Sequence, residues 1–262
     1  MLKLSMLKLS QLLMLFVAAL LNTTALAQEA DDPDGGQYVA GKHYEVLDTP
    51  IRTQDPKKIE ATEVFWYGCS HCYRFEPLVA EWAKDLPEDV VLVKSPAIWH
   101  PTMKLHAQAY YTAVALDVID DLHGALFEEI NLRKNKLASE GAIGKLFAAH
   151  GVDPEKFTQT FNSFGVTAAV QQAEARQRGY KITGTPEMVV NGKYRITARM
   201  AGSQEGMLTV ASYLITKERQ LMAKPAAGQD TPPATKVDLS GAASADQSDA
   251  GAASGEPDSA PE

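Results

Sequence analysis

The chain has 262 residues, a formal net charge of −8 and a hydrophobic content of 45%. Its length allows one or two domains, and its composition is sufficient for a sizeable buried core. The acidic excess is partly local, since residues 223–262 alone carry a net charge of −5. No basic block occurs along the chain, so nothing in the charge pattern favours binding to nucleic acid or anionic lipid.

The first 27 residues have the three parts of a secretory signal peptide. Lys3 and Lys8 give a positive start, residues 12–21 form an unbroken apolar run, and Ala25-Leu26-Ala27 is a small-x-small cleavage site. A membrane anchor is the alternative, but spanning a bilayer takes roughly 20 apolar residues. We therefore expect residues 1–27 to be a cleaved signal peptide and the mature protein to be exported.

Two polar segments enclose the part of the chain that we expect to be compact. Residues 28–43 are rich in Gly and Asp and are typical of a flexible start. Residues 223–262 consist mostly of Ala, Ser, Gly, Pro, Asp and Gln, and cannot bury enough apolar area to offset the entropy of ordering. We predict a disordered acidic tail there and a compact region over about 44–222.

Strand and helix patterns alternate at the start of the compact region. Residues 63–67 form a short aromatic run suited to a buried strand. Residues 69–84 follow with apolar side chains at helical spacing, and Pro77 should kink that helix because it removes a backbone donor. Residues 90–93 form a second apolar strand. This order predicts a sheet with a helix between its first two strands.

A long helical block and a hairpin follow. Residues 104–178 have helical spacing throughout, with helix starts at Ser139 and Asp153 and an end near Gly179. Asn191-Gly192 is a two-residue hairpin signal between two strand-like runs, and a final helix is predicted over about 203–221. The whole order predicts a mixed α/β sheet domain interrupted by an all-helical insertion.

The only two cysteines, Cys69 and Cys72, have the spacing C-x-x-C and enclose Ser70 and His71. In an exported protein the simplest interpretation is a structural disulfide. A cross-link stabilises mainly by restricting the unfolded chain, however, and so short a loop restricts almost nothing. The spacing therefore favours a redox-active pair over a structural one.

A metal site is another interpretation of the same pair. Structural zinc usually takes four Cys or His ligands, so two of the six histidines would have to complete the set. None of the histidines forms a second H-x-x-H or C-x-x-C pair. Haem attachment requires C-x-x-C-H, and Tyr73 follows Cys72. We therefore expect no metal and no bound cofactor.

The redox interpretation has a physical mechanism, because a strand followed by a helix places Cys69 at a helix N-terminus, where backbone N–H groups favour a thiolate. A helix end is worth about 0.3–1 kcal/mol, which lowers a pKa by roughly one unit at most. Direct hydrogen bonds and a positive neighbour would have to add to it. His71 is the candidate for that neighbour, and a solvated loop histidine is the alternative.

Two segments far apart in the chain carry longer motifs: EVFWYGCSHCYRFE at residues 63–76 and GTPEMVVNGKY at residues 184–194. Together they resemble the DsbA family of bacterial periplasmic disulfide oxidoreductases, over about residues 38–222. The resemblance implies a thioredoxin fold with an inserted all-helical domain. The thioredoxin-like domain would be discontinuous, with residues 44–99 and 180–222, and the helical insertion would occupy residues 100–179.

The resemblance also implies roles for the residues around the cysteines. Cys69 would be the exposed nucleophile and Cys72 the buried resolving cysteine, while His71 would stabilise the Cys69 thiolate. Pro186 would be a cis-proline facing the disulfide, preceded by Thr185. The backbone of that loop would bind an extended substrate by strand addition.

Three charged residues match positions of the family near its active site. Glu63 corresponds to a buried acid and Lys94 to its basic partner. A carboxylate in an apolar strand has a raised pKa, so Glu63 is a candidate proton relay for Cys72. Without the family, Glu63 would be interpreted as an acid of an edge strand. Glu76 also matches a family acid, and a solvated surface role is its alternative.

Two positions depart from the usual family pattern. Ser70 replaces the proline of the commonest Pro-His dipeptide, and it adds a hydroxyl and a backbone donor. Thr185 replaces the more usual valine, and its hydroxyl is placed to hydrogen-bond near the sulfurs. Both changes affect the expected redox potential, and the sequence does not give the direction.

The sequence therefore predicts a periplasmic thiol:disulfide oxidoreductase that introduces disulfide bonds into reduced, unfolded exported proteins. A membrane quinone-linked partner of the DsbB type would reoxidise it, and we expect a monomer that contacts the membrane only through that partner. A reductase or isomerase on the same scaffold is one alternative. Such isomerases usually dimerise through an extra N-terminal domain, whereas only about sixteen residues separate the cleavage site from the first strand. A peptide- or metal-binding module without turnover is the other alternative.

Overall fold

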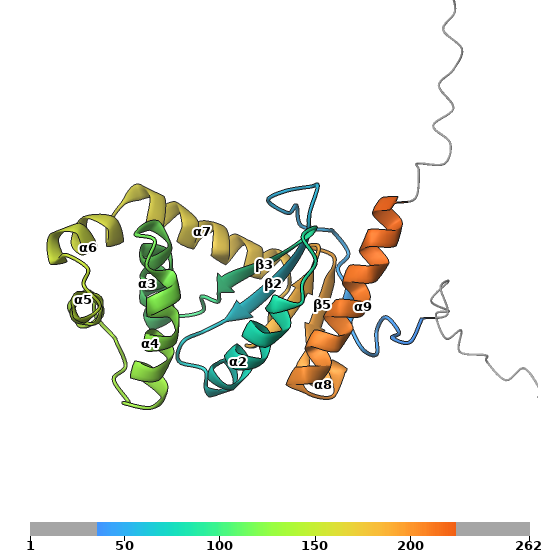
Figure 1. Ribbon diagram of the computed structural model, residues 1–262, viewed down its shortest axis with the longest axis horizontal. Helices are drawn as coiled ribbons and strands as arrows, with labels where there is room; N and C mark the ends of the chain where they lie inside the picture. The colour runs from blue at the N-terminus through green and yellow to red at the C-terminus, as the bar shows by residue number, and fades with distance from the viewer. Residues whose placement is uncertain (1–35, 224–262) are drawn as a thin grey trace, which may run out of the picture. The chain divides into compact units, whose positions relative to one another are not determined.

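The computed structural model describes residues 36–223, whose fold is shown in Figure 1. The predicted signal peptide, residues 1–27, lies outside the described residues, as does the predicted acidic tail beyond residue 223. Within residues 36–223, no helix combines the length and the apolar character needed to cross a bilayer.

The strands of the described region form one mixed sheet in the order β1-β5-β4-β2-β3. β2 pairs with β3 in parallel, and every other neighbouring pair is antiparallel. The central strand β2 is buried along its whole length. The strands are β1 Glu45–Val46, β2 Ile59–Phe65, β3 Val90–Pro96, β4 Glu187–Val190 and β5 Tyr194–Thr197.

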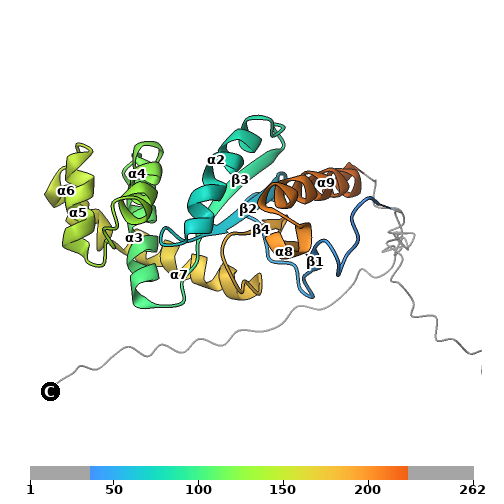
Figure 2. The ribbon, with the colours of Figure 1, turned by 90° about the horizontal axis from the view of Figure 1, so that it is seen from below.

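Helices cover both faces of this sheet. α2 and α9 lie on one face and α7 lies on the other, while α3 to α6 gather beyond β3 (Figures 1 and 2). In the chain, α3 to α7 all fall between β3 and β4. The helices are α2 Ser70–Lys84, α3 Pro101–Ala115, α4 Ile119–Asn131, α5 Glu140–Ala149, α6 Pro154–Phe161, α7 Phe164–Gly179, α8 Ala198–Ala201 and α9 Gln204–Ala223.

The helical block that the sequence predicts is present, but the boundaries of the helical insertion stay a prediction. Both α3 and α7 contact β3, so the helices between β3 and β4 also contribute to the layer that covers the sheet. Because these helices pack directly against the sheet, no interface between two domains is seen near residue 100 or residue 179.

Alternation along β2 decides which side chains lie beneath α2. Ala61 packs with Phe75 and Val79 of α2, and Phe65 packs with Cys72. Because side chains alternate along a strand, Glu63 falls between Ala61 and Phe65 on the same face. The predicted buried acid therefore lies under the helix that carries the cysteines.

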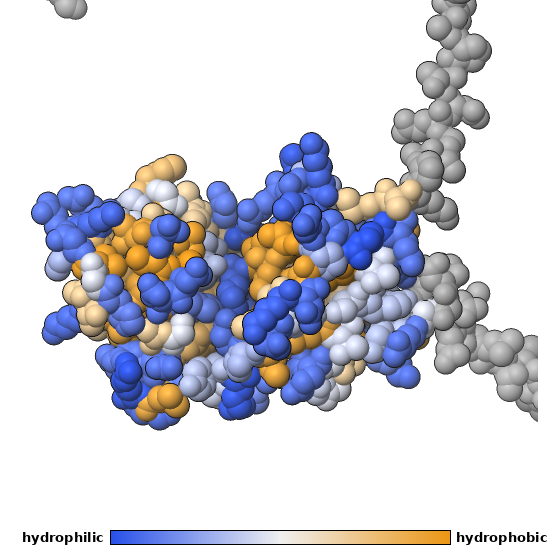
Figure 3. Space-filling model, viewed as in Figure 1, coloured by the Kyte–Doolittle hydropathy of each residue, from blue (hydrophilic) through white to orange (hydrophobic). Residues whose placement is uncertain are grey.

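Hydrophobic surface on the face seen in Figure 3 gathers in two regions, one over α3 and α4 and one over the sheet beside α2. The buried side chains form corresponding clusters, one among the helices and one between the sheet, α2 and α9. Phe65, at the end of β2, and Cys72, in the first turn of α2, both belong to the helical cluster. The start of α2 therefore lies where these two cores meet.

Local signals predicted from the sequence are confirmed at several element ends. Ser139 caps α5 by accepting a hydrogen bond from Ala142 N at 3.2 Å, and Asp153 caps α6 directly before Pro154. Asn191 and Gly192 adopt φ values of 51° and 64°, as a type I′ hairpin turn requires.

The first strand predicted from the sequence, residues 63–67, corresponds to β2, which the structure places at Ile59–Phe65. Its first half includes two buried polar residues, and Thr62 donates a hydrogen bond to Glu60 Oε1 at 2.8 Å. Because these polar side chains hydrogen-bond to each other, they can be buried, and a search for apolar runs does not detect this part of the strand. α2 runs from Ser70 to Lys84 as one helix with Pro77 inside it.

Candidate active site

The two cysteines lie at the start of α2, one before the helix and one in its first turn. Cys69 is the N-cap residue with extended backbone, and its Sγ accepts a hydrogen bond from Cys72 N at 3.4 Å. Both cysteines are free thiols; Cys69 is half-buried, whereas Cys72 is fully buried. Of the two sulfurs, only that of Cys69 is therefore open to a substrate.

The surroundings of Cys69 favour its thiolate. Hydrogen bonding from the Cys72 thiol contributes most, and the pKa of Cys69 is lowered from its ordinary value of 9.0 to about 5 despite partial burial. The Thr185 side chain and the backbone N–H groups of Cys72 and His71 add to this effect. Since a helix end alone shifts a pKa by about one unit, direct hydrogen bonds supply most of the change.

Cys72 has the opposite environment. Burial, together with the hydrogen bond to Cys69 and its charge, raises the pKa of Cys72 far above its ordinary value. Phe65, Tyr67 and Phe127 belong to the same buried cluster. One sulfur of the pair is thus held as an anion while the other keeps its proton, which is the division expected of a nucleophilic and a resolving cysteine.

The loop before β4 faces the cysteines. The Thr185–Pro186 peptide bond is cis and Pro186 is buried. The Thr185 carbonyl oxygen lies 3.3 Å from Cys69 Sγ, and the Thr185 side chain acts to lower the pKa of both cysteines. The hydroxyl that distinguishes this chain from the usual family pattern is therefore in contact with the redox pair.

His71 and Ser70, the two residues between the cysteines, are both exposed. The guanidinium group of Arg74 lies 3.0 Å from His71 Nδ1. Because a guanidinium only donates hydrogen bonds, Nδ1 is the acceptor in this contact. The backbone N–H of His71 hydrogen-bonds to Cys69. The role of the His71 ring stays a prediction.

The predicted buried acid and its basic partner are in direct contact. Glu63 and Lys94 are paired in the register of β2 and β3, and Lys94 Nζ lies 2.6 Å from Glu63 Oε2. The Glu63 side chain is 0% exposed. Burial, its main influence, raises the pKa of Glu63, although the charge of Lys94 opposes the change.

Glu76 also binds Lys94, with Oε1 at 2.8 Å, so its predicted surface alternative does not describe it. Burial opposes its charge, but His123 and Lys94 outweigh burial and lower the pKa of Glu76 to about 2. Two carboxylates thus share one ammonium group. The surroundings raise the pKa of Glu63 and lower that of Glu76. Glu63 is therefore suited to carry a proton, and Glu76 is suited to remain an anion.

His123 and Tyr67 extend this network and were not predicted as site residues. His123, on α4, places Nε2 3.2 Å from Glu76 Oε2 and Nδ1 2.8 Å from Tyr67 Oη. A single histidine in a helical segment has no partner at a recognisable spacing, so the sequence carries no signal for it. The helices between β3 and β4 therefore contribute a side chain to the network beneath the cysteines.

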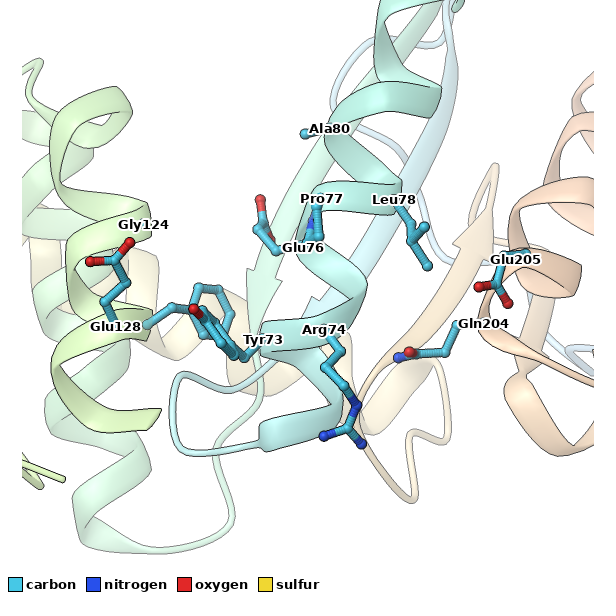
Figure 4. A pocket seen from close by; sticks show the side chains of 11 residues that line it. Tyr73, Arg74, Glu76, Pro77, Leu78, Ala80, Gly124, Glu128, Gln204 and Glu205 are labelled. Atoms are coloured by element: carbon cyan, nitrogen blue, oxygen red, sulfur yellow. The ribbon is translucent and has the colours of Figure 1, made fainter. Parts of the chain in front are cut away.

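A pocket of about 710 Å³ lies along α2, and residues of α4 and α9 also line it (Figure 4). Figure 4 shows Tyr73 and Glu76 on the side of α4, and Leu78 on the side of Gln204 and Glu205. Gln204 also donates a hydrogen bond to His71 O at 2.8 Å. The pocket begins at Tyr73, which follows Cys72 in the chain, and provides a partly apolar surface against which a polypeptide side chain can pack.

No group of three or more His, Cys, Asp or Glu side chains within the described part of the chain is arranged to hold a metal ion. The chemistry that this arrangement can perform is that of the two sulfurs: a stabilised thiolate, a buried thiol and a nearby acid. That set is suited to thiol–disulfide exchange.

Comparison with known proteins identifies the same family along most of the chain. Residues 62–212 match the model of the DSBA-like thioredoxin domain. The thiol:disulfide interchange protein DsbA of Pseudomonas aeruginosa is 41% identical over 208 residues, which cover 79% of this chain and 96% of the relative. The protein of the same name from Azotobacter vinelandii is 39% identical and covers 74% of this chain and 91% of its own length.

Solved structures agree with this assignment. The crystal structure of Pseudomonas aeruginosa DsbA superposes with a TM-score of 0.69 at 43% identity, covering 71% of this chain and 97% of that chain. The oxidoreductase DsbA from Xylella fastidiosa gives a TM-score of 0.67 at 30% identity, covering 71% of this chain and all of the other. The predicted α/β class and thioredoxin fold are confirmed, as is the predicted activity. The chain belongs to the DsbA family of thioredoxin-like proteins and is a disulfide-forming thiol:disulfide oxidoreductase.

Proposed function

We propose that Cys69 and Cys72 are the redox couple through which this protein oxidises reduced, unfolded proteins in the periplasm. The contrast between the two sulfurs supports this proposal: the pKa of Cys69 is lowered to about 5, whereas that of Cys72 is raised. Stabilising the thiolate stabilises the dithiol form, and this makes the disulfide form an oxidant.

The exchange proceeds in two displacements. A substrate thiolate attacks Sγ of Cys69 in the Cys69–Cys72 disulfide, so that a mixed disulfide forms and Cys72 leaves as a thiolate that takes up a proton. A second substrate thiolate then attacks the substrate sulfur of the mixed disulfide. The substrate gains a disulfide, and Cys69 leaves as a thiolate, which is a good leaving group because its pKa is low.

Glu63 supplies the proton that Cys72 takes up. It lies on the strand face beneath α2, it is buried, and burial raises the pKa of its carboxyl group. A carboxylic acid whose pKa is raised is better suited to general acid catalysis than an ordinary carboxyl group. Lys94 holds Glu63 in place and compensates the negative charge that the carboxylate carries after proton transfer, and Glu76 in turn binds Lys94.

The cis-Pro loop and the α2 pocket receive the substrate. Thr185 presents its backbone beside Cys69, where an extended polypeptide can add as a strand. Apolar side chains of an unfolded protein pack into the pocket along α2. A DsbB-type, quinone-linked membrane protein accepts the two electrons and restores the disulfide, and the signal-like N-terminus is consistent with export.

The glutathione equilibrium of the Cys69–Cys72 couple tests this function. The wild-type protein should be far more oxidising than thioredoxin, and Cys72→Ala should trap a reduced polypeptide as a Cys69 mixed disulfide. A couple as reducing as thioredoxin would refute the oxidase and favour the reductase alternative. Refolding of scrambled ribonuclease separates an isomerase from an oxidase, and zinc bound at one ion per chain would favour the metal-binding alternative.

A further inference from the structure

The cis-Pro loop is held from behind by a buried carboxylate that the proposed exchange does not use. Glu187 is the first residue of β4, and its side chain is 4% exposed. Its Oε1 accepts hydrogen bonds from Gly184 N at 2.9 Å and Thr183 N at 3.3 Å. One carboxylate oxygen therefore binds two consecutive peptide groups immediately before Thr185.

Arg195 holds this carboxylate in place from the neighbouring strand β5. Its Nε donates to Glu187 Oε2 at 2.6 Å, and one of its terminal nitrogens donates to Thr183 Oγ1 at 2.5 Å. The other terminal nitrogen lies 2.9 Å from Glu45 Oε2 on β1. The guanidinium group thus connects the loop to the two strands at the β1 edge of the sheet.

The register of the sheet explains why these groups meet. Arg195 is paired with Val189, and Glu187 lies two residues before Val189 on the same strand. Both side chains therefore emerge on one face, which Val189 shares with Val64 and Tyr180. That face is opposite to the one on which Glu63 lies beneath α2.

We propose that Glu187 and Arg195 are positioning residues for the exchange reaction, because they fix the loop of residues 183–186 and thereby hold Thr185 against the sulfur of Cys69. This inference rests on the proposed role of the cysteine couple. Thr185 lies 3.3 Å from Cys69 Sγ through its carbonyl oxygen, its side chain favours the thiolate, and hydrogen-bonding contacts of this kind weaken steeply when their geometry changes. A hydrogen bond to a thiolate is stronger than one to a neutral disulfide sulfur. The position of the loop therefore sets the balance between the dithiol and disulfide forms.

The chain offers a matched control in Glu218 on α9, whose side chain is 0% exposed. Its carboxylate accepts hydrogen bonds from Tyr194 Oη at 2.9 Å and Lys193 Nζ at 2.6 Å, at the turn between β4 and β5. Glu187 and Glu218 are thus both buried, both charged and both bound to the same hairpin. Of the two, only Glu187 holds the cis-Pro loop.

The test compares Glu187→Gln with Glu218→Gln. A carboxamide has one acceptor oxygen and a donating NH2 group, so if its oxygen keeps the loop it loses the hydrogen bond from Arg195 Nε. We expect E187Q to shift the glutathione equilibrium by about threefold to tenfold toward the disulfide form, the effect of one lost hydrogen bond. The absorbance titration of the Cys69 thiolate should move to higher pH. E218Q should lower the melting temperature of both redox forms equally. Because the dithiol and disulfide forms then lose the same stability, the glutathione equilibrium between them should stay unchanged.

A second substitution tests whether the effect passes through Thr185. In a Thr185→Val background, from which the hydroxyl is absent, E187Q should shift the equilibrium by less than half as much as in the wild type. Arg195→Lys, which keeps the charge but reaches fewer partners, should shift it in the same direction, and it serves if E187Q does not fold. An unchanged equilibrium in a folded E187Q or R195K variant, or an equal shift in E218Q, would overturn the proposal.

The two proposals fail separately. If the wild-type couple does not exchange with glutathione at all, the proposed function is lost. If the wild type exchanges as an oxidant and the loop variants do not differ from it, only the positioning role is lost.

Discussion

Two buried glutamates lie on opposite faces of the sheet, close to the redox pair, and their hydrogen bonding differs. Glu187 accepts hydrogen bonds at both oxygens, from the cis-Pro loop and from Arg195. Glu63 accepts one from Lys94 at Oε2, whereas its Oε1 has no hydrogen-bond partner among the residues that the structure describes. An anion with filled acceptor sites is suited to hold structure. A buried carboxyl with an unfilled site favours its protonated form.

The charge balance around Glu63 points the same way. Among residues 36–223, Lys94 is the only cation in contact with both Glu63 and Glu76, and of these two carboxylates His123 contacts only Glu76. One ammonium group does not neutralise two buried carboxylates, so one of them gains by carrying a proton. The difference between Glu63 and Glu187 is therefore that between a group that moves a proton and a group that holds a loop.

Replacing Lys94 with Met should have the largest effect. The change leaves Glu63 and Glu76 without their common cation, and breaking a buried ion pair in this way costs about 3–5 kcal/mol of unfolding free energy. Because the folded protein must then take up a proton, the loss should be largest at neutral pH and shrink as pH falls toward 5. Urea unfolding at several pH values measures both effects.

The control for Lys94 removes the buried acid as well. Lys94→Met combined with Glu63→Gln should recover a large part of the lost stability, because the buried charge is gone. A K94M protein that is equally destabilised at pH 5 and pH 7.5, with no recovery in the double variant, would mean that Glu63 has no special tendency to be protonated.

His123→Phe should have the next largest effect, because it keeps an aromatic ring among Phe65 and Phe127 but removes the contact with Glu76. We expect a loss of about 1.5–3 kcal/mol at pH 7, typical of a hydrogen bond to a charged group. The folded pKa of Glu76 lies below its unfolded value, so its stabilisation is present above about pH 4.5 and is lost as pH falls toward 2.

The pH dependence provides the sharper measurement for His123. Removal of the histidine raises the pKa of Glu76 toward its ordinary value, so the stability of H123F should change less between pH 4.5 and pH 2 than that of the wild type. Tyr67→Phe removes only the partner of His123 Nδ1 and should leave this pH dependence almost unchanged. Parallel curves for H123F and wild type would contradict the assigned contact.

Features that depend on residues close in the chain could be predicted from the sequence. The spacing of Cys69 and Cys72 favours a redox pair without any structure, and Asn191-Gly192 gives the hairpin turn. The contact between His71 and Arg74 joins residues three apart on a helix, so it too was open to prediction.

Groups that meet only after the chain has folded could not be predicted in this way. His123 reaches Glu76 from α4, and Arg195 reaches Glu187 through a strand register that the sequence does not specify. The family resemblance supplied Glu63, Lys94 and Glu76, but neither of these two contacts. Charged side chains in a strand or helix are usually solvated, so pattern alone gives no reason to bury them.

Glu63→Gln should have the smallest effect on stability and a distinct effect on rate. The carboxamide is neutral like the protonated acid, so the glutathione equilibrium should not move, but it has no acidic proton to give to Cys72. We expect the oxidation of a reduced peptide to slow by about tenfold, less than the usual contribution of a positioned acid because water can also deliver a proton.

Glu187→Gln should show the opposite pattern, with a shifted equilibrium. Stopped-flow kinetics and the glutathione equilibrium, measured on both variants, distinguish the two glutamates. If E63Q moves the equilibrium and E187Q only the rate, the two roles are reversed, since a proton donor acts on a barrier and a fixed loop acts on the energies of the two redox forms.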